Sequence, residues 1–128
     1  MDDRARCGVW IDEREAVLFW FGAQREQSVE RIEPGYGGTG YSMFSDSGED
    51  RRRRERVRGL HQDVARHLDG ADEIYVFGPG RDPEGLAKYL REDEDLAERI
   101  VAVETVSPMM QDQRAAWARE FFGDSQQT

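Results

Sequence analysis

The sequence predicts an α/β domain built on one mixed, five-stranded sheet, and three observations support this fold class. The chain has 128 residues, which is enough for one domain and too few for two. Its first third contains three strand-like segments joined by short turns, a pattern typical of antiparallel strands. Its second half alternates helical and strand-like segments, as expected of parallel strands joined by crossover helices. We therefore expect one domain over 1–128.

The three strands of the first third are expected at 7–12, 15–22 and 26–33. The first is rich in β-branched and aromatic residues and stops at a charged turn. The second is apolar on both faces, which favours a central strand covered on both sides. The third is polar around Val29 and Ile32, which is typical of a solvated edge strand.

A long helix is expected over 49–69, after a flexible, glycine-rich loop over 34–50. Its apolar face is formed by residues at spacings of three and four, namely Val57, Leu60, Val64 and Leu68. Gly70 is the expected stop. The loop shows no helical or strand period, and loops of this length are usually functional or disordered.

The remaining elements alternate. Strands are expected at 73–77 and 99–104, one helix from Asp82 onward, and a last helix around 111–122. Asp82 is expected to cap its helix, with Pro83 at the first helical position. Gly123 is expected to end the last helix and to leave a polar tail over 124–128.

These elements follow the order β-β-β-α-β-α-β-α. The later strands need right-handed helical connections to lie parallel, so all five strands must share one mixed sheet. The strand order 3-2-1-4-5, with helices on both faces, keeps the connections short. This is the ribonuclease H-like architecture, which several proteins of the translation machinery share.

Composition and hydropathy exclude several classes of protein. Cys7 is the only cysteine, which excludes an internal disulfide and a cysteine-based zinc site. No apolar run approaches the roughly 18 residues that a membrane span needs. The first residues also lack the apolar segment of a signal peptide. We therefore expect a cytoplasmic protein that does not enter a membrane.

The charge is strongly polarised. The net charge is −9, but residues 51–58 contain six arginines and one glutamate and carry +5, which leaves −14 on the rest of the chain. On a helix, consecutive arginines form two stripes, one of Arg51, Arg54 and Arg58 and one of Arg52 and Arg56. Arginine suits bidentate contact with phosphates and stacking on bases. This pattern predicts local contact with RNA.

The alternative for this cluster is a solvated helix face. In that interpretation the arginines neutralise the neighbouring carboxylates of Glu49, Asp50 and Glu55 and have no ligand. The sequence leaves both possibilities open.

The loop offers a second candidate contact. Its glycines, among them Gly37 and Gly38, permit close backbone approach, and Tyr36, Tyr41 and Phe44 can stack on bases. A disordered loop without function is the alternative. The candidate RNA-binding residues are thus Arg51, Arg52, Arg54, Arg56, Arg58, Tyr36, Gly37, Gly38 and Tyr41.

Several motifs resemble a known family. These are Gly8-Val9-Trp10-Ile11-Asp12, then Arg14-Glu15-Ala16-Val17, and later Phe77-Gly78-Pro79-Gly80. Their order and spacing resemble the middle domain of eukaryotic and archaeal class-1 translation termination factors and of the ribosome-rescue factor Pelota. They are more similar still to small stand-alone bacterial proteins labelled translational machinery components. The resemblance covers residues 7 to about 122 and implies a role at the ribosome.

The chain also departs from that family. Termination factors carry a Gly-Gly-Gln motif for peptidyl-tRNA hydrolysis, whereas the nearest string here is Gly37-Gly38-Thr39-Gly40. We expect neither the N-terminal codon-reading domain nor the C-terminal partner-binding domain. The resemblance therefore does not imply hydrolytic termination.

Asp12 raises the possibility of a nuclease, because the ribonuclease H-like fold carries a metal-binding carboxylate on its first strand. Glu55 or Asp63 are the candidates for the further acids that two-metal hydrolysis needs. However, the strand at 73–77 ends in Phe77 and Gly78, with no acid at the corresponding place. A turn residue that caps backbone amides is the favoured interpretation of Asp12.

For the remaining residues that could bind a ligand or metal, the sequence favours structural roles. His61 and His67 lie six residues apart on one helix and do not share a face. Trp10, Trp20 and Trp117 are expected as core or half-core anchors, and Cys7 as a small buried residue. The turn Gly78-Pro79-Gly80 opens onto a helix N-terminus, but a purely structural turn is favoured there.

These observations predict a non-enzymatic, translation-associated module without a cofactor, which contacts ribosomal RNA or tRNA. The first alternative is a protein-interaction or homodimerisation module, in which the arginines meet an acidic surface. The second is a metal-dependent nuclease.

Overall fold

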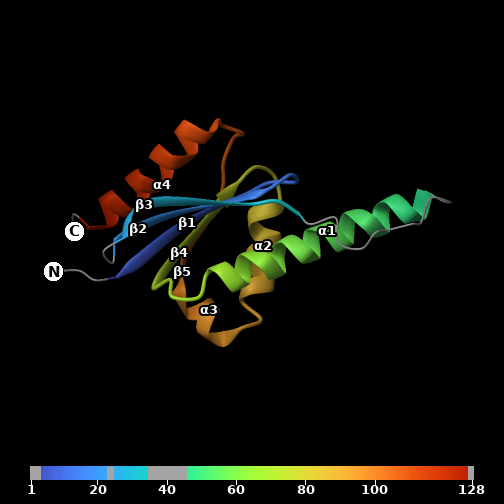
Figure 1. Cartoon of the computed structure of the whole chain (residues 1–128), viewed down its shortest axis with the longest axis horizontal. Helices are drawn as coiled ribbons and strands as arrows, with labels where there is room; N and C mark the ends of the chain where they lie inside the picture. The colour runs from blue at the N-terminus through green and yellow to red at the C-terminus, as the bar shows by residue number, and fades with distance from the viewer. Residues whose placement is uncertain (1–3, 23–24, 35–45, 127–128) are drawn as a thin grey trace.

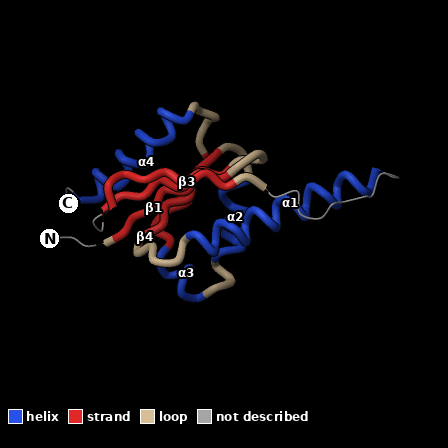
Figure 2. Tube along the Cα trace, in the orientation of Figure 1, coloured by secondary structure: helices blue, strands red, loops and turns tan. Residues whose placement is uncertain are grey.

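One mixed sheet of five strands organises the protein, with the order β3-β2-β1-β4-β5. The computed structural model describes residues 4–22, 25–34 and 46–126. The strands are β1 (Ala5–Ile11), β2 (Ala16–Gly22), β3 (Arg25–Ile32), β4 (Glu73–Gly78) and β5 (Ile100–Thr105) (Figures 1 and 2). The predicted fold class and strand order are confirmed.

Strand directions follow the connections. β2 pairs antiparallel with both β1 and β3, whereas β1–β4 and β4–β5 pair parallel. Short turns join the antiparallel strands, and helices join the parallel ones. The carboxyl ends of β1 and β4 therefore meet at one edge of the sheet.

The helices form a layer on each face of the sheet. α1 (Asp46–His67), α2 (Asp82–Leu90) and α3 (Glu94–Arg99) lie on one face, and α4 (Gln111–Gln126) covers the other (Figure 1). The first face packs aliphatic residues such as Ile11, Leu18 and Val76 against α1 and α2. The second packs aromatic residues, Phe19 and Tyr75 among them, against α4.

α1 extends well beyond the sheet (Figure 1). Leu60, Val64 and Leu68 are buried, as their spacing predicts, but Val57 is 37% exposed. The prediction that Val57 belongs to the buried face is therefore wrong, because no sheet lies beneath this part of the helix. α1 also begins at Asp46, earlier than the expected residue 49.

α2 and α3 differ from the sequence prediction at their N-termini. Asp82 does not cap α2, because the carbonyl of Arg81 accepts the first helical hydrogen bond, from the amide of Gly85 at 3.0 Å. Arg81 therefore holds the cap position, without a side-chain bond. The short helix α3 was not predicted. Its cap is Asp93, whose carboxylate accepts hydrogen bonds from the amides of Asp95 (2.9 Å) and Leu96 (3.4 Å).

α4 crosses β1 at Gly8. A β-carbon on Gly8 would lie 2.7 Å from the β-carbon of Ala118, so only glycine permits this approach without a shift. Gly123 does not end the helix, which continues to Gln126 and so includes part of the expected polar tail. A glycine weakens a helix by roughly 1 kcal/mol but does not forbid it.

Candidate nucleic-acid interface

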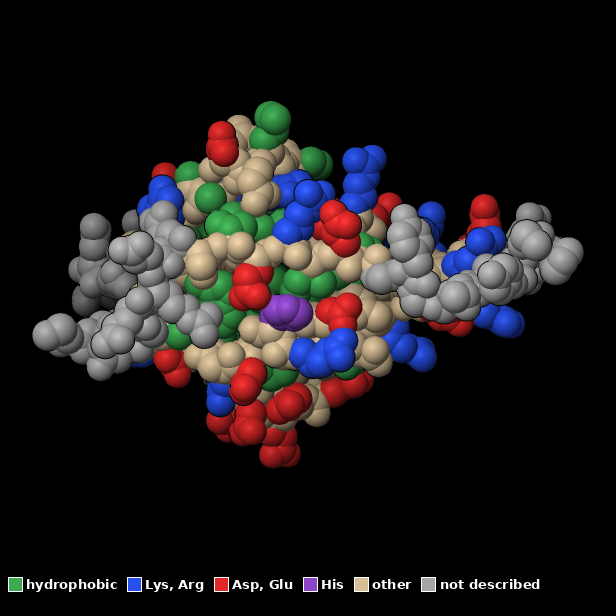
Figure 3. All heavy atoms as spheres, in the orientation of Figure 1, with side chains coloured by type: hydrophobic (Ala, Val, Ile, Leu, Met, Phe, Trp, Pro, Cys, Tyr) green, Lys and Arg blue, Asp and Glu red, His purple; other side chains and the backbone are tan. Residues whose placement is uncertain are grey.

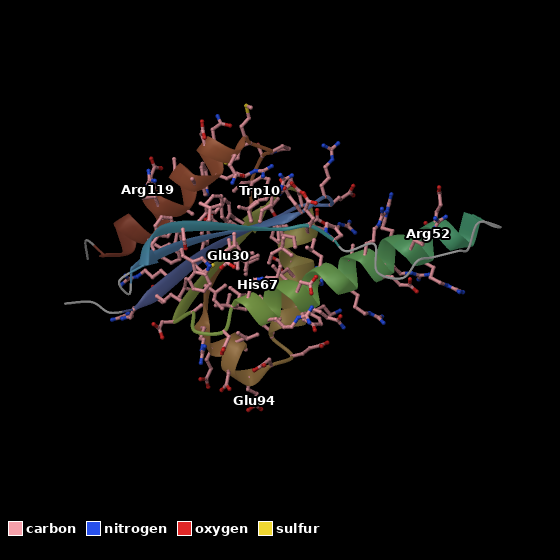
Figure 4. The ribbon with its side chains drawn as sticks, viewed as in Figure 1. Trp10, Glu30, Arg52, His67, Glu94 and Arg119 are labelled. Carbon is pink, nitrogen blue, oxygen red and sulfur yellow. The ribbon has the colours of Figure 1, made fainter. Side chains whose placement is uncertain are left out.

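The arginine cluster lies on the part of α1 that projects from the body. The helix is continuous from Asp46 to His67. Among its residues from 48 onward, Gly48 is buried and the next buried residue is Leu60. Arg52 is seen near the far end of the helix in Figure 4, beyond the edge of the sheet. The cluster is therefore presented on a helix that leaves the body of the protein.

Five of the six arginines have no ion pair within the described part of the chain. Arg51, Arg53, Arg54, Arg56 and Arg58 are exposed, and none forms an ion pair with another residue that the structure describes. Arg52 is half-buried, and its Nε donates a hydrogen bond to the carbonyl of Gly48 at 3.4 Å. The five exposed arginines can therefore reach a ligand from the solvent.

The helical geometry places the three residues of the first predicted stripe on one side of α1. Positions three and four apart are neighbours on a helix, so Arg51, Arg54 and Arg58 share one side of α1. Arg53 was not among the sequence candidates, although it is exposed and belongs to the same arginine run.

Acidic residues on the same segment reduce its charge without cancelling it. Glu49, Asp50 and Glu55 are exposed, so residues 49–58 together carry +3. A hollow of about 280 Å³ is lined by residues of both signs, namely Glu49, Asp50, Arg52, Arg53 and Arg56. The local potential remains positive on an anionic protein.

Acidic side chains gather elsewhere. The segment around α3 holds Glu92, Asp93, Glu94, Asp95 and Glu98, all exposed. Figure 3 shows this acidic patch over α3, apart from the basic side chains along α1, and Figure 4 labels Glu94 within it. The two regions are therefore separate and of opposite charge.

The predicted loop contacts Tyr36, Gly37, Gly38 and Tyr41, like Phe44, lie outside the described residues. They stay a prediction.

Asp12 is a turn residue. One carboxylate oxygen accepts hydrogen bonds from the amides of Arg14 (2.7 Å) and Glu15 (3.0 Å), and the other accepts one from the indole of Trp10 (2.8 Å). Arg114 adds an ion pair to this carboxylate at 3.5 Å. Its oxygens are thus engaged in holding the turn after β1.

The proposed partners of Asp12 in metal binding lie elsewhere. Asp63 forms an ion pair with Arg66 on α1, and Glu55 is exposed on the projecting segment. Across 4–22, 25–34 and 46–126, no three His, Cys, Asp or Glu side chains are grouped so that they could hold a metal ion.

The two histidines and the cysteine pack against or contact neighbouring residues of the fold. Burial lowers the pKa of His61, which packs on Tyr89 with ring centroids 5.7 Å apart. His67 contacts the carbonyl oxygen of Asp63 through Nδ1 at 2.7 Å. Cys7 is buried in the sheet, as predicted.

No described helix has both the length and the apolar character needed to cross a membrane.

Comparisons with known proteins identify the fold. The structure resembles Pelota from Archaeoglobus fulgidus (TM-score 0.58, 17% identity over 91% of this chain) and Pelota from Thermoplasma acidophilum (0.55, 17%, 85%). It also resembles an archaeal translation termination factor, aRF1 (0.55, 12%, 98%). The predicted resemblance to these proteins is confirmed at the level of the fold.

The chain matches only part of those proteins. It spans 31% and 30% of the two Pelota chains, respectively, and 40% of the termination factor. No protein-family model matches the sequence, and no curated protein matches it.

Proposed function

We propose that this protein is a non-enzymatic, translation-associated module that contacts ribosomal RNA or tRNA in the cytoplasm through the projecting arginines of α1. One observation carries the proposal: Arg51, Arg53, Arg54, Arg56 and Arg58 are exposed without an ion pair to any described residue. The shared fold of Pelota and the termination factor supports the choice of a ribosomal partner.

The geometry suits a phosphate backbone. Arg51 and Arg58 lie about 10 Å apart along the helix axis, at 1.5 Å per residue, with Arg54 between them. Guanidinium groups bind phosphate oxygens bidentately, and this contact needs no particular base sequence. We therefore expect the stripe to follow a nucleic-acid backbone with little sequence preference.

The rest of the surface restricts the contact. Outside residues 51–58 the chain carries −14, and a surface of that sign repels a polyanion. The acidic patch over α3 should therefore turn away from the RNA. This polarity favours approach with the arginine-bearing half of α1 first.

Co-sedimentation with ribosomes tests the proposal. We expect the wild-type protein to pellet with ribosomes at low salt and the R51E/R54E/R58E variant to stay in the supernatant. R14E/R81E/R91E is the matched control, because it changes the net charge equally at exposed arginines outside α1. Pelleting of the α1 variant at the wild-type level would refute the proposal.

A protein-interaction role is the second candidate. The acidic patch over α3 has the chemistry to pair with the arginines of α1 on another copy of this chain. Sedimentation velocity at low salt would then show association that R51E/R54E/R58E abolishes. A monomer at all concentrations excludes this self-pairing.

A further inference from the structure

A small hollow lies on the α4 side of the sheet, the side opposite to α1. Its volume is about 190 Å³, and it is lined by Tyr75, Glu104, Trp117, Glu120 and Phe121. These residues come from β4, β5 and α4. The hollow is thus separate from the arginine cluster, and what it binds does not depend on the proposed RNA contact.

Aromatic rings form one part of the hollow. Phe121 stacks on the buried ring of Tyr75 with centroids 3.9 Å apart. Trp117, one turn earlier on α4, donates its indole N–H to the Tyr75 hydroxyl at 2.8 Å. Trp117 is nevertheless 41% exposed, so it is the least enclosed of the three tryptophans that the sequence predicts as core or half-core anchors.

Two carboxylates form the other part. Glu104 accepts a hydrogen bond from the Tyr75 hydroxyl, and burial together with this bond raises the pKa of Tyr75, which keeps the phenol neutral. Within the described part of the chain, neither Glu104 nor Glu120 forms an ion pair. No lysine or arginine is among the residues that line the hollow.

We propose that this hollow binds one organic cation, an ammonium or guanidinium group of side-chain size. Tyr75 is buried and stacked on Phe77 and Phe121, so Trp117 and Phe121 are the rings that can attract a cation. The carboxylates of Glu104 and Glu120 supply the negative charge. The volume is below the roughly 300 Å³ at which drug-sized ligand pockets begin. It therefore suits a single cationic group.

Such a cation has two sources, a basic side chain of a partner protein or a free quaternary ammonium compound. Two probes distinguish them, N-acetyl-arginine amide and tetramethylammonium chloride, each titrated at constant ionic strength with NaCl. The NMR signal of the Trp117 indole N–H is the readout. We expect a saturable shift of this signal, while the buried indoles of Trp10 and Trp20 stay unchanged. The tighter probe identifies the source.

A charge-removing variant completes the test. Glu120→Gln keeps the size of the side chain and disturbs no hydrogen bond to a described residue, and we expect it to weaken binding at least threefold. Glu94→Gln on the acidic patch is the control and should bind as the wild type does. A linear, non-saturating shift with both probes, or equal affinity in Glu120→Gln, would overturn the proposal.

Discussion

Val57 and Leu60 lie three residues apart on α1, yet Leu60 is 3% exposed and Val57 is 37% exposed. The helix therefore loses its contact with the sheet between these two positions. On the N-terminal side of this point, all the arginines of the cluster are exposed except Arg52, which is half-buried. The buried half of α1 thus serves as an anchor for the projecting half.

The first prediction concerns this anchor. Leu60→Ala should lower the free energy of unfolding by about 2–5 kcal/mol, because it removes a buried side chain and leaves a cavity. Val57→Ala should change it by less than about 0.5 kcal/mol. Urea denaturation of both variants measures the difference. Similar losses in the two variants would mean that Val57 is packed against the body.

The second prediction concerns the crossing of α4 over β1. Gly8→Ala places a β-carbon 2.7 Å from Ala118, and such overpacking should cost about 1–3 kcal/mol of stability. Gly59→Ala is the control, because a β-carbon there meets nothing within 4 Å and should stabilise α1 by about 0.5–1 kcal/mol. Thermal unfolding followed by circular dichroism compares them. Equal stability of Gly8→Ala and wild type would contradict the close crossing.

The third prediction concerns pH. Burial lowers the pKa of His61 from its ordinary value of 6.5 in the folded protein, so the unfolded chain binds the proton more tightly. The contribution of neutral His61 to stability is therefore present above pH 6.5 and is lost as the pH falls below that value. An NMR titration of the His61 ring should give a midpoint below 6.5.

The lowered pKa of His61 also predicts how the free energy of unfolding depends on pH. His61→Gln should remove part of the decrease in unfolding free energy between pH 7.5 and pH 5.5, because glutamine does not titrate. Urea denaturation at several pH values measures this. Identical pH dependence in His61→Gln and wild type would contradict the burial of the ring.

The sheet topology was predictable because it follows from connections. Short turns permit only antiparallel neighbours, and the later strands need helical crossovers, which leaves the order 3-2-1-4-5. Burial was less predictable. Periodicity shows that Val57 shares a helix face with Leu60, but it does not show where the sheet ends beneath that face.

The candidate site was predictable only where it depends on neighbouring residues in the sequence. The arginine run is local, so all its arginines except Arg53 were named from the sequence, whereas its projection from the body depends on the tertiary structure. The hollow around Trp117 was missed, because Tyr75, Glu104 and Glu120 come together only in the folded sheet. The cap of α3 at Asp93 did have a local signal, an aspartate before an acidic first turn.

The salt dependence of RNA binding tests the central claim most directly. Fluorescence anisotropy with a labelled tRNA and a labelled ribosomal RNA fragment gives the association constant at several salt concentrations. If at least three arginines of α1 neutralise phosphates, the logarithm of this constant should fall with the logarithm of salt with a slope of about −2 or steeper. R51E/R54E/R58E should bind too weakly to measure, while R14E/R81E/R91E keeps the wild-type slope. A flat salt dependence, or equal binding by the two triple variants, would contradict the proposed role of the projecting helix.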